Sequence, residues 1–551
     1  MGIYARIRVF LQALKPGNGG RLWRMKKDFF TLLGFDRPYT DFELLETEKG
    51  APRFFGPGPF RRETAPKESL GPVFRSLGKN RRAIEAACLA EENTDFIFRP
   101  FLLCGKVPAL AVFVNGMADG ETINDFILKG AMLPRSLPKG ELTRVVMEQV
   151  FPMQEAETQG ELDQVVAALC EGRTAVFLEG AGQAVLLDTR GFASRSIESS
   201  QSENVVVGPH EGFTENLRTG VTQLRRILKR PDFVCAFRRA GGKNGTKLAL
   251  CYLGGVCNES LLQEVKKRLR QVDTELILSA GTLEQLLEDH SLSPIPQILL
   301  TERPDRAAAA VMEGRVAILV EGSPQALVLP VTLSALLTSP EDDYLRRPLG
   351  TVIRVVRLAG ALLSVLLPAW FLALATHHQG LLNSQVLSTV VSSRRLVFMP
   401  LPLEVIFLLM VFQLVREAGI RVPGAVGQTV GIIGGLILGQ AAVSANMVST
   451  VVLIIVALAG LGNFCIPDYS MQLAVSWYRI ALCIFAGMAG LLGTFVLLMA
   501  SLAWLCSQKS FGVPFMSPFA PKTRSRAPLL FRGSLHRPGG GEDVINREAS
   551  L

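Results

Sequence analysis

The feature that most constrains the fold of this 551-residue chain is a region dominated by apolar runs, which extends from Thr351 to Cys506. The stretch Gly427–Val443 within it, GQTVGIIGGLILGQAAV, is nearly long enough to cross a bilayer as a helix. On such a helix, glycines spaced four residues apart form one ridge without side chains, against which another membrane helix can pack closely. The glycines with this spacing are Gly427, Gly431, Gly435 and Gly439.

The region that precedes the apolar runs repeats itself. Gly105–Ile127 and Gly245–Val265 each contain a strand, a glycine turn and a polar-capped helix. In the second copy, Asn258 is the expected helix cap. Glu171–Leu187 and Glu313–Leu329 follow in the same order, and each has the pattern of two strands around a turn. The shared order and similar offset of both pairs predict an internal duplication.

Between the two copies, Gly208–Asp232 contains a predicted helix that starts near Thr214. Four apolar residues follow one face of this helix, and four basic residues lie toward its C-terminal end, where cations interact favourably with the helix dipole. We expect a solvated helix between the lobes rather than an anion site. The basic residues are Arg225, Arg226, Lys229 and Arg230.

These patterns predict an α/β duplicated soluble domain followed by an α-helical transmembrane bundle of four to five spans. No secretory signal is visible near residue 1, so we expect the soluble domain in the cytosol. The predicted parts are a basic, poorly ordered N-terminal arm (1–74), a first α/β lobe (75–205), a second α/β lobe (206–345), a transmembrane helical domain (346–508) and a basic C-terminal tail (509–551).

Full spans are expected at Val355–Thr376, about 426–445, about 447–466 and Ile480–Cys506. Leu401–Val415 is short for a span and is interrupted by two polar residues, so we expect a re-entrant segment, with a fifth span as the alternative. Four spans and one re-entrant segment return the basic tail to the cytosol, as the positive-inside rule requires.

The candidate functional residues are polar groups inside these apolar segments. Glu404 could have a functional role, in which it coordinates an ion or pairs with an arginine, or a structural role in a salt bridge or at an interfacial position near Pro402. We weigh the functional and the structural role equally. The glutamines could line a pore or join helices through hydrogen bonds. In the last predicted span, Gly487, Gly490 and Gly493 offer a second surface for close helix packing. The candidate pore or ion-pathway residues are Glu404, Gln413, Gln428 and Gln440.

Composition and motifs argue against several other classes of protein. The net charge of +9 comes mostly from arginines beside the apolar segments and from the two tails, and no basic stripe with interleaved aromatics predicts nucleic-acid binding. The nine cysteines are scattered, so neither a metal site nor a disulfide framework is expected. The sequence has no P-loop and no G-x-S-x-G motif, and we do not expect an enzyme or a bound cofactor.

Six segments occur in an order typical of one family. They are Thr189–Ser199 (TRGFASRSIES), Gly208–Thr219 (GPHEGFTENLRT), Glu302–Pro330 (ERPDRAAAAVMEGRVAILVEGSPQALVLP), Arg416–Val443, Ile466–Ala474 (IPDYSMQLA) and Ser510–Pro521 (SFGVPFMSPFAP). Together they resemble the GerA family, the A subunits of spore germinant receptors. The resemblance runs from about residue 75 to 521, and both tails lie outside it.

This resemblance implies a multi-pass subunit of the endospore inner membrane, with its large N-terminal domain in the cytosol. Its implied partners are a transporter-like B subunit, which binds the nutrient, and a lipoprotein C subunit. The A subunit is implied to form a homo-oligomeric, nutrient-gated cation channel without catalytic residues. A non-conducting scaffold and the A-like subunit of the dipicolinate-release channel complex are the alternatives. A secondary transporter is less consistent with the sequence, because the membrane half has no evident inverted repeat.

Overall fold

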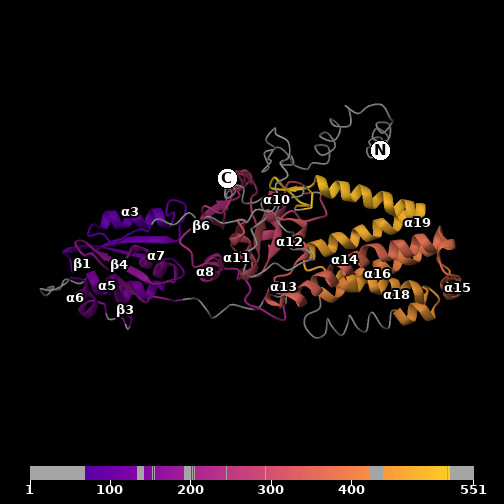
Figure 1. The fold of residues 1–551 in the computed structure, drawn as a ribbon, viewed down its shortest axis with the longest axis horizontal. Coiled ribbons are helices and arrows are strands. Elements are labelled where there is room, and N and C mark those ends of the chain that lie inside the picture. The colour runs from indigo at the N-terminus through magenta and orange to yellow at the C-terminus, as the bar shows by residue number, and fades with distance from the viewer. Residues whose placement is uncertain are drawn as a thin grey trace, which may run out of the picture.

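The structure is a computed structural model. It describes residues 69–520 apart from 133–141, 152, 154, 192–199, 201, 202, 204, 243, 244, 292, 422–438 and 518. Two sheet-containing lobes and a helical region follow one another along its longest axis (Figure 1).

The first lobe is a five-stranded antiparallel sheet in the order β1-β2-β4-β5-β3, with helices on both faces. α3 and α7 pack on one face, and η1, α5 and α6 pack on the other. Its elements are α3 (Leu77–Ala87), β1 (Phe96–Leu103), β2 (Val107–Val114), α4 (Gly120–Thr122), the π-helix η1 (Ile123–Leu128), α5 (Lys129–Met132), α6 (Leu142–Gln149), β3 (Ala156–Gln159), α7 (Leu162–Cys170), β4 (Thr174–Leu178) and β5 (Ala184–Leu187).

The second lobe repeats this sheet, with the equivalent strand order β6-β7-β9-β10-β8. The matching topologies confirm the duplication that the sequence predicts. The elements are α8 (Leu217–Ile227), β6 (Phe233–Ala240), β7 (Thr246–Leu253), α9 (Glu259–Gln271), α10 (Ala280–Leu287), β8 (Leu299–Thr301), α11 (Pro304–Met312), β9 (Val316–Val320), β10 (Ala326–Leu329), α12 (Leu333–Leu337) and α13 (Glu341–Tyr344).

Local sequence signals explain these elements. The central strands β4, β5, β9 and β10 consist mainly of apolar residues and are buried throughout, since helices cover both faces of each sheet. The predicted hairpins form as β4–β5 and β9–β10, both antiparallel. Asn258 caps α9 as expected, because its side chain accepts hydrogen bonds from the backbone N–H groups of Ser260 and Leu261.

The helix between the lobes is not solvated as the sequence suggested. α8 begins after its cap, Asn216, and its Arg225 is fully buried. The Arg225 guanidinium lies 2.8 Å from the Asp95 carboxylate of the first lobe and donates to the carbonyl of Phe233 at 3.0 Å. Asn93 of the first lobe also accepts the backbone N–H of Cys235 on β6 at 3.0 Å. The prediction was wrong because a partner carboxylate distant in sequence allows the arginine to be buried.

The helical region consists of helices and a short hairpin at its C-terminal end. Among the described residues, two of its helices, α14 and α19, have the length and hydropathy of a membrane span. The count of four to five spans therefore remains a prediction. The elements are α14 (Arg347–Thr376), the 3₁₀ helix η2 (Gln379–Leu381), α15 (Ser384–Ser393), α16 (Leu401–Arg421), α18 (Thr450–Asn463), α19 (Tyr469–Ser507), β11 (Lys509–Ser510) and β12 (Val513–Pro514).

α19 is a helical hairpin rather than one straight span. Its two halves diverge from a sharp turn at Gly490, where φ is 61° and ψ is −143° (Figure 1). Side chains from the two halves still meet at a distance from the turn, since the hydroxyls of Tyr478 and Ser501 lie 2.7 Å apart. A straight helix would separate these two residues by about 34 Å. Gly490, which the sequence analysis assigned to close helix packing, instead makes the turn.

Close helix packing occurs between α14 and α18. A Cβ added to Gly360 would lie 2.7 Å from Sγ of Cys465, and a Cβ on Gly462 would collide with the carbonyl of Gly360. Glycine therefore lets these two backbones approach each other. Within the predicted ridge, Gly427, Gly431 and Gly435 lie outside the described residues. Gly439 is described, and an added Cβ there would only touch Leu453 at 3.7 Å.

Candidate functional site

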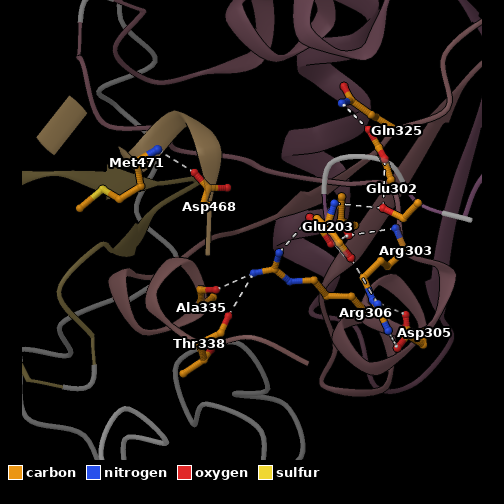
Figure 2. A network of polar contacts seen from close by, with 12 residues as sticks. Glu203, Glu302, Arg303, Asp305, Arg306, Gln325, Ala335, Thr338, Asp468 and Met471 are labelled. Carbon is orange, nitrogen blue, oxygen red and sulfur yellow. Dashed lines mark hydrogen bonds and ion pairs between the residues drawn. The ribbon is translucent and has the colours of Figure 1, made fainter. Parts of the chain in front are cut away.

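The candidate site is the junction where the second lobe meets the helical region. Arg306 of α11 lies at its centre and reaches two separate segments (Figure 2). Its guanidinium is 3.1 Å from the carboxylate of Glu203 and donates to the carbonyls of Ala335 at 2.9 Å and Thr338 at 3.4 Å. Asp468, the N-cap of α19, lies nearby and accepts the backbone N–H of Met471 (Figure 2).

Glu203 is itself held by several groups. Its carboxylate accepts the hydroxyl of Thr301 at 2.9 Å, and its backbone carbonyl accepts Arg303 at 3.4 Å. Burial raises the pKa of Glu203, while the charges of Arg306 and Arg303 and the Thr301 hydrogen bond act in the opposite direction. A buried carboxylate and a guanidinium thus tie the linker between the lobes to α11.

A second attachment joins α13 to the start of α14. The fully buried carboxylate oxygen Oδ2 of Asp342 lies 3.2 Å from Arg354 Nε and 2.5 Å from Arg357 Nη1. Arg354 also pairs with the exposed Asp343 at 2.9 Å. Two arginines one turn apart therefore hold the first long helix against the second lobe. Both belong to the arginines that the sequence places beside the apolar segments, but the sequence does not identify the carboxylate that they contact.

A third attachment is the segment that follows α19. The ring of Phe511 lies 4.1 Å from the guanidinium carbon of Arg268, and its backbone N–H donates to Asp289 at 2.8 Å. The hydroxyl of Ser510 donates to the carbonyl of Gln297 at 2.6 Å, and Leu333 donates to the carbonyl of Phe515 at 2.9 Å. The helical region therefore begins and ends on the side of the second lobe.

The candidate Glu404 lies at the opposite end of the helical region, close to the end of α15. It is fully buried, pairs with Arg394 at 3.0 Å and accepts the backbone N–H of Ser449 at 2.5 Å. Its carboxylate thus joins α15, α16 and the start of α18. The structure thus contains a pairing of Glu404 with an arginine, which is common to the functional and the structural role that the sequence left open, and ion coordination by Glu404 stays a prediction.

The other candidates do not gather around Glu404. Gln413 is nine residues further along α16, about 14 Å away, and its buried Oε1 has no hydrogen-bond partner. Gln440 is described and exposed, and Gln428 lies outside the described residues. Together with the glycine ridge, these residues remain candidates rather than a site assembled by the fold.

Sequence reasoning missed a buried polar tract beside α19. Gln472, Ser476 and Arg479 recur every three or four residues and so share one face of this helix. The side chain of Gln472 accepts a hydrogen bond from Arg416 at 2.6 Å, and Asn463 donates to the hydroxyl of Ser476 at 3.2 Å. The periodic polar residues in an apolar helix were a signal that could have identified this tract.

Neither lobe supplies an evident metal centre. Across the described parts of the chain, no three histidine, cysteine, aspartate or glutamate side chains come close enough to hold a metal ion. Carboxylates do accumulate on α10, where burial and neighbouring carboxylates raise the pKa of Glu284 to about 8 and that of Glu288 to about 7. These two groups lie near Asp289, which pairs with Arg268 at 2.6 Å.

Comparisons with known proteins cover most of the chain. The family model described as Bacillus/Clostridium GerA spore germination protein matches residues 85–537. Spore germination protein KA of Bacillus subtilis (strain 168) is 32% identical over 457 residues, which cover 83% of this chain and 84% of the relative. Spore germination protein A1 of the same strain is 33% identical over 431 residues, 78% of this chain and 88% of the relative.

One further relative and one solved structure are also similar to the chain. The uncharacterized membrane protein YfkQ of Bacillus subtilis (strain 168) is 30% identical over 470 residues, 84% of this chain and 91% of that protein. The crystal structure of the N-terminal domain of the A subunit of the Bacillus megaterium spore germinant receptor GerK3 matches 47% of this chain and 95% of that chain. Its sequence identity is 26% and its TM-score is 0.38.

Proposed function

Because the chain belongs to the GerA family of spore germination proteins, we propose that it is the A subunit of a spore germinant receptor. In this proposal it resides in the endospore inner membrane with its lobes in the cytosol, together with a transporter-like B subunit and a lipoprotein C subunit. Several copies assemble into a nutrient-gated cation channel that initiates germination.

The observation that carries this proposal is the attachment of the second lobe to both ends of the helical region. Asp342 binds the start of α14, Arg306 lies near Asp468 at the start of α19 (Figure 2), and Phe511 docks the segment after α19 onto the lobe. A displacement of the lobe would therefore move the ends of two long helices together. Such coupling between a soluble part and membrane helices is what gating requires.

The outer surface of α14 supports a membrane location and assembly. Exposed apolar side chains cover its length, as expected for a surface that contacts lipid or another copy of the chain. These side chains include Val352, Val356, Leu363 and Trp370. The proposed ion pathway lies beside the glycine ridge and comprises Glu404, Gln413, Gln428 and Gln440. In this pathway Glu404 acts by holding together the end of α15, α16 and the start of α18.

Flux measurements test this proposal. The full chain would be reconstituted in liposomes with its B and C partners, and nutrient-dependent potassium release would be compared among variants. We expect Gly435→Leu to abolish both assembly and flux, and Asp342→Asn to weaken the nutrient response while assembly persists. Asp343→Asn is the comparison variant: this neighbouring carboxylate also pairs with Arg354, but its side chain is 65% exposed, so its loss should weaken the nutrient response less. Oligomers that never release potassium, with or without partners, would contradict the channel.

A second candidate function is a non-conducting scaffold, or the A-like accessory subunit of a dipicolinate-release channel complex. The uncharacterized membrane protein YfkQ matches as large a share of the chain as the germination proteins, so the extent of similarity is compatible with a role outside the receptor. Deletion of the gene distinguishes the two functions. Loss of the response to one nutrient supports the receptor, whereas slow dipicolinate release with every germinant supports the accessory subunit.

A further inference from the structure

The buried polar tract beside α19 contains an arginine without a carboxylate partner among the described residues. Arg479 is 1% exposed and lies midway between the start of α19 and its turn at Gly490. Its Nη1 donates to the hydroxyl of Ser364 on α14 at 3.0 Å and to the carbonyl of Ala459 on α18 at 3.1 Å. Its Nε is buried and has no hydrogen-bond partner.

The sequence limits where a compensating negative charge can come from. Between residues 347 and 507, the chain has three carboxylates, Glu404, Glu417 and Asp468. Glu404 pairs with Arg394, and Asp468 caps α19 at the opposite end from the turn. Glu417 directly follows Arg416 in the chain, and residues 422–438 include no acidic residue. The helical region thus supplies no evident carboxylate to Arg479.

A second cation makes the tract more positive. Arg416 is 8% exposed, and its Nη1 is buried without a hydrogen-bond partner, while Nη2 donates to Gln472. The C-terminal end of α18, where Ala459 lies, carries only a partial negative charge from its free carbonyls. Burying an ionised side chain is costly unless an opposite charge compensates it. The tract therefore has the chemistry of an anion site.

We propose that Arg479 binds a small monovalent inorganic anion within the helical region, on the side of its unpaired Nε. The ligand has to be small, because Arg479 is enclosed between α14 and α18 and is closed to a lipid headgroup or a side chain of another subunit. Arg416 lies between Arg479 and the lobe-facing end of the tract, where its guanidinium is 5.4 Å from the ring of Tyr469. It therefore marks the end from which an anion enters.

Chloride is the probe for this site, and gluconate is the matched anion that is too large to enter. The thermal unfolding midpoint of the purified full chain in detergent would be measured in sodium chloride and in sodium gluconate at equal ionic strength. We expect chloride to raise the midpoint of the wild type in a saturable manner. Arg479→Gln should remove this dependence and unfold at the same temperature in both salts.

Two further variants make the result specific. Arg394→Gln changes an arginine of the same region that already has its carboxylate, so it should keep the full chloride dependence although it is less stable. Arg479→Lys keeps the charge but loses the planar donors, so saturation should require at least tenfold more chloride. If Arg479→Gln does not fold, the chloride dependence of Arg479→Lys tests the proposal in its place.

Two outcomes would overturn the proposal. One is a wild-type midpoint that is equal in chloride and gluconate, which would mean that the Ser364 hydroxyl and the Ala459 carbonyl suffice for Arg479. The other is an identical chloride dependence in wild type and in the foldable Arg479 variants, which would indicate a general salt effect. Because the assay measures binding to one chain, its result is independent of channel activity.

Discussion

Arg394 and Glu404 form an ion pair, with Arg394 Nε 3.0 Å from Glu404 Oε2. Arg394 is the C-cap of α15, which lies at the end of the helical region farthest from the lobes (Figure 1). The carboxylate is fully buried, whereas the arginine side chain is 25% exposed. The buried Glu404 carboxylate is compensated while Arg394 is in place, but removal of Arg394 would leave a buried negative charge without a counter-ion.

Arg394→Gln should therefore destabilise the protein by about 2–3 kcal/mol, somewhat less than the cost at a fully enclosed ion pair. Glu404→Gln should cost less, because an amide needs no counter-ion. The free energy of unfolding in detergent measures both effects. Arg395→Gln, which alters the exposed neighbour, is the control and should be nearly neutral. An equal loss in the Arg394 and Arg395 variants would argue against the ion pair.

Gly490→Ala should disrupt the hairpin of α19. Its positive φ disfavours residues with a Cβ, and the added atom would lie 2.7 Å from Cε1 of His378 and 2.8 Å from Cβ of His377. We expect a loss of about 2–3 kcal/mol in the free energy of unfolding. Gly419→Ala, in α16, is the matched control, because an added Cβ there meets no atom within 4 Å. That change should be neutral or slightly stabilising. Equal stabilities of the two variants would contradict the turn.

The carboxylates of α10 predict a stability that falls as pH rises. The pKa of Glu284 is raised to about 8 and that of Glu288 to about 7, so the folded chain retains protons that the unfolded chain releases above about pH 4.5. The contribution of these two protonated carboxyl groups to the free energy of unfolding is complete at low pH and is lost between about pH 5 and 8. It changes by at most about 1.4 kcal/mol per pH unit for each group.

Thermal unfolding at pH 6 and pH 8 measures this effect. Glu284→Gln should flatten the pH dependence and should be more stable than the wild type at pH 8, because the amide carries no charge to be buried. Glu275→Gln, which removes an exposed carboxylate in the preceding loop, should leave the slope unchanged. A wild-type midpoint that increases from pH 6 to pH 8 would refute the assignment.

The register of β6 and β7 can be tested with a cross-link. Cys235 and Cys251 lie directly opposite each other, with their sulfur atoms 3.6 Å apart. The N–H and C=O of Cys235 bond to Asn93 and Thr94 rather than to β7, so the two cysteines form a non-hydrogen-bonded pair, whose Cα atoms lie about 4.5 Å apart. This separation falls within the range that a disulfide can bridge.

Diamide should therefore oxidise the two thiols to one disulfide, taking up the two electrons and two protons that they release. Mass spectrometry of peptides from the full chain would detect the Cys235–Cys251 cross-link. Cys251→Ser should remove it without creating another cross-link to Cys235. A cross-link between Cys235 and a different cysteine in the wild type would show that the register is different.

Much of the soluble part could be predicted from the sequence, because its signals are local. Two hairpins, the cap at Asn258 and the order of the repeated segments all depend on residues close together in the chain, and all occur in the structure. The prediction that α8 is solvated was wrong because the burial of this helix depends on a contact between residues far apart in the chain. Whether Arg225 is exposed depends on Asp95, which lies 130 residues earlier in the sequence.

The candidate site was much less predictable. Sequence reasoning selected Glu404 because a carboxylate in an apolar segment is unusual, but it could not identify Arg394 as the partner. It overlooked Arg306 and Asp342, since charged residues in a mixed α/β region carry no sign that they lie at the junction with the helical region. It also treated Arg479 as part of a link between spans, although the fold encloses it among three helices.

The sequence by itself determined the family, the duplication and the division into an α/β part and an apolar helical part, because each depends on composition, periodicity or segment order. The tertiary structure alone decided which charges are paired, where α19 turns back and which glycines let helices approach. The physical reason is that the cost of a buried charge or a close backbone contact depends on atoms that only folding brings together.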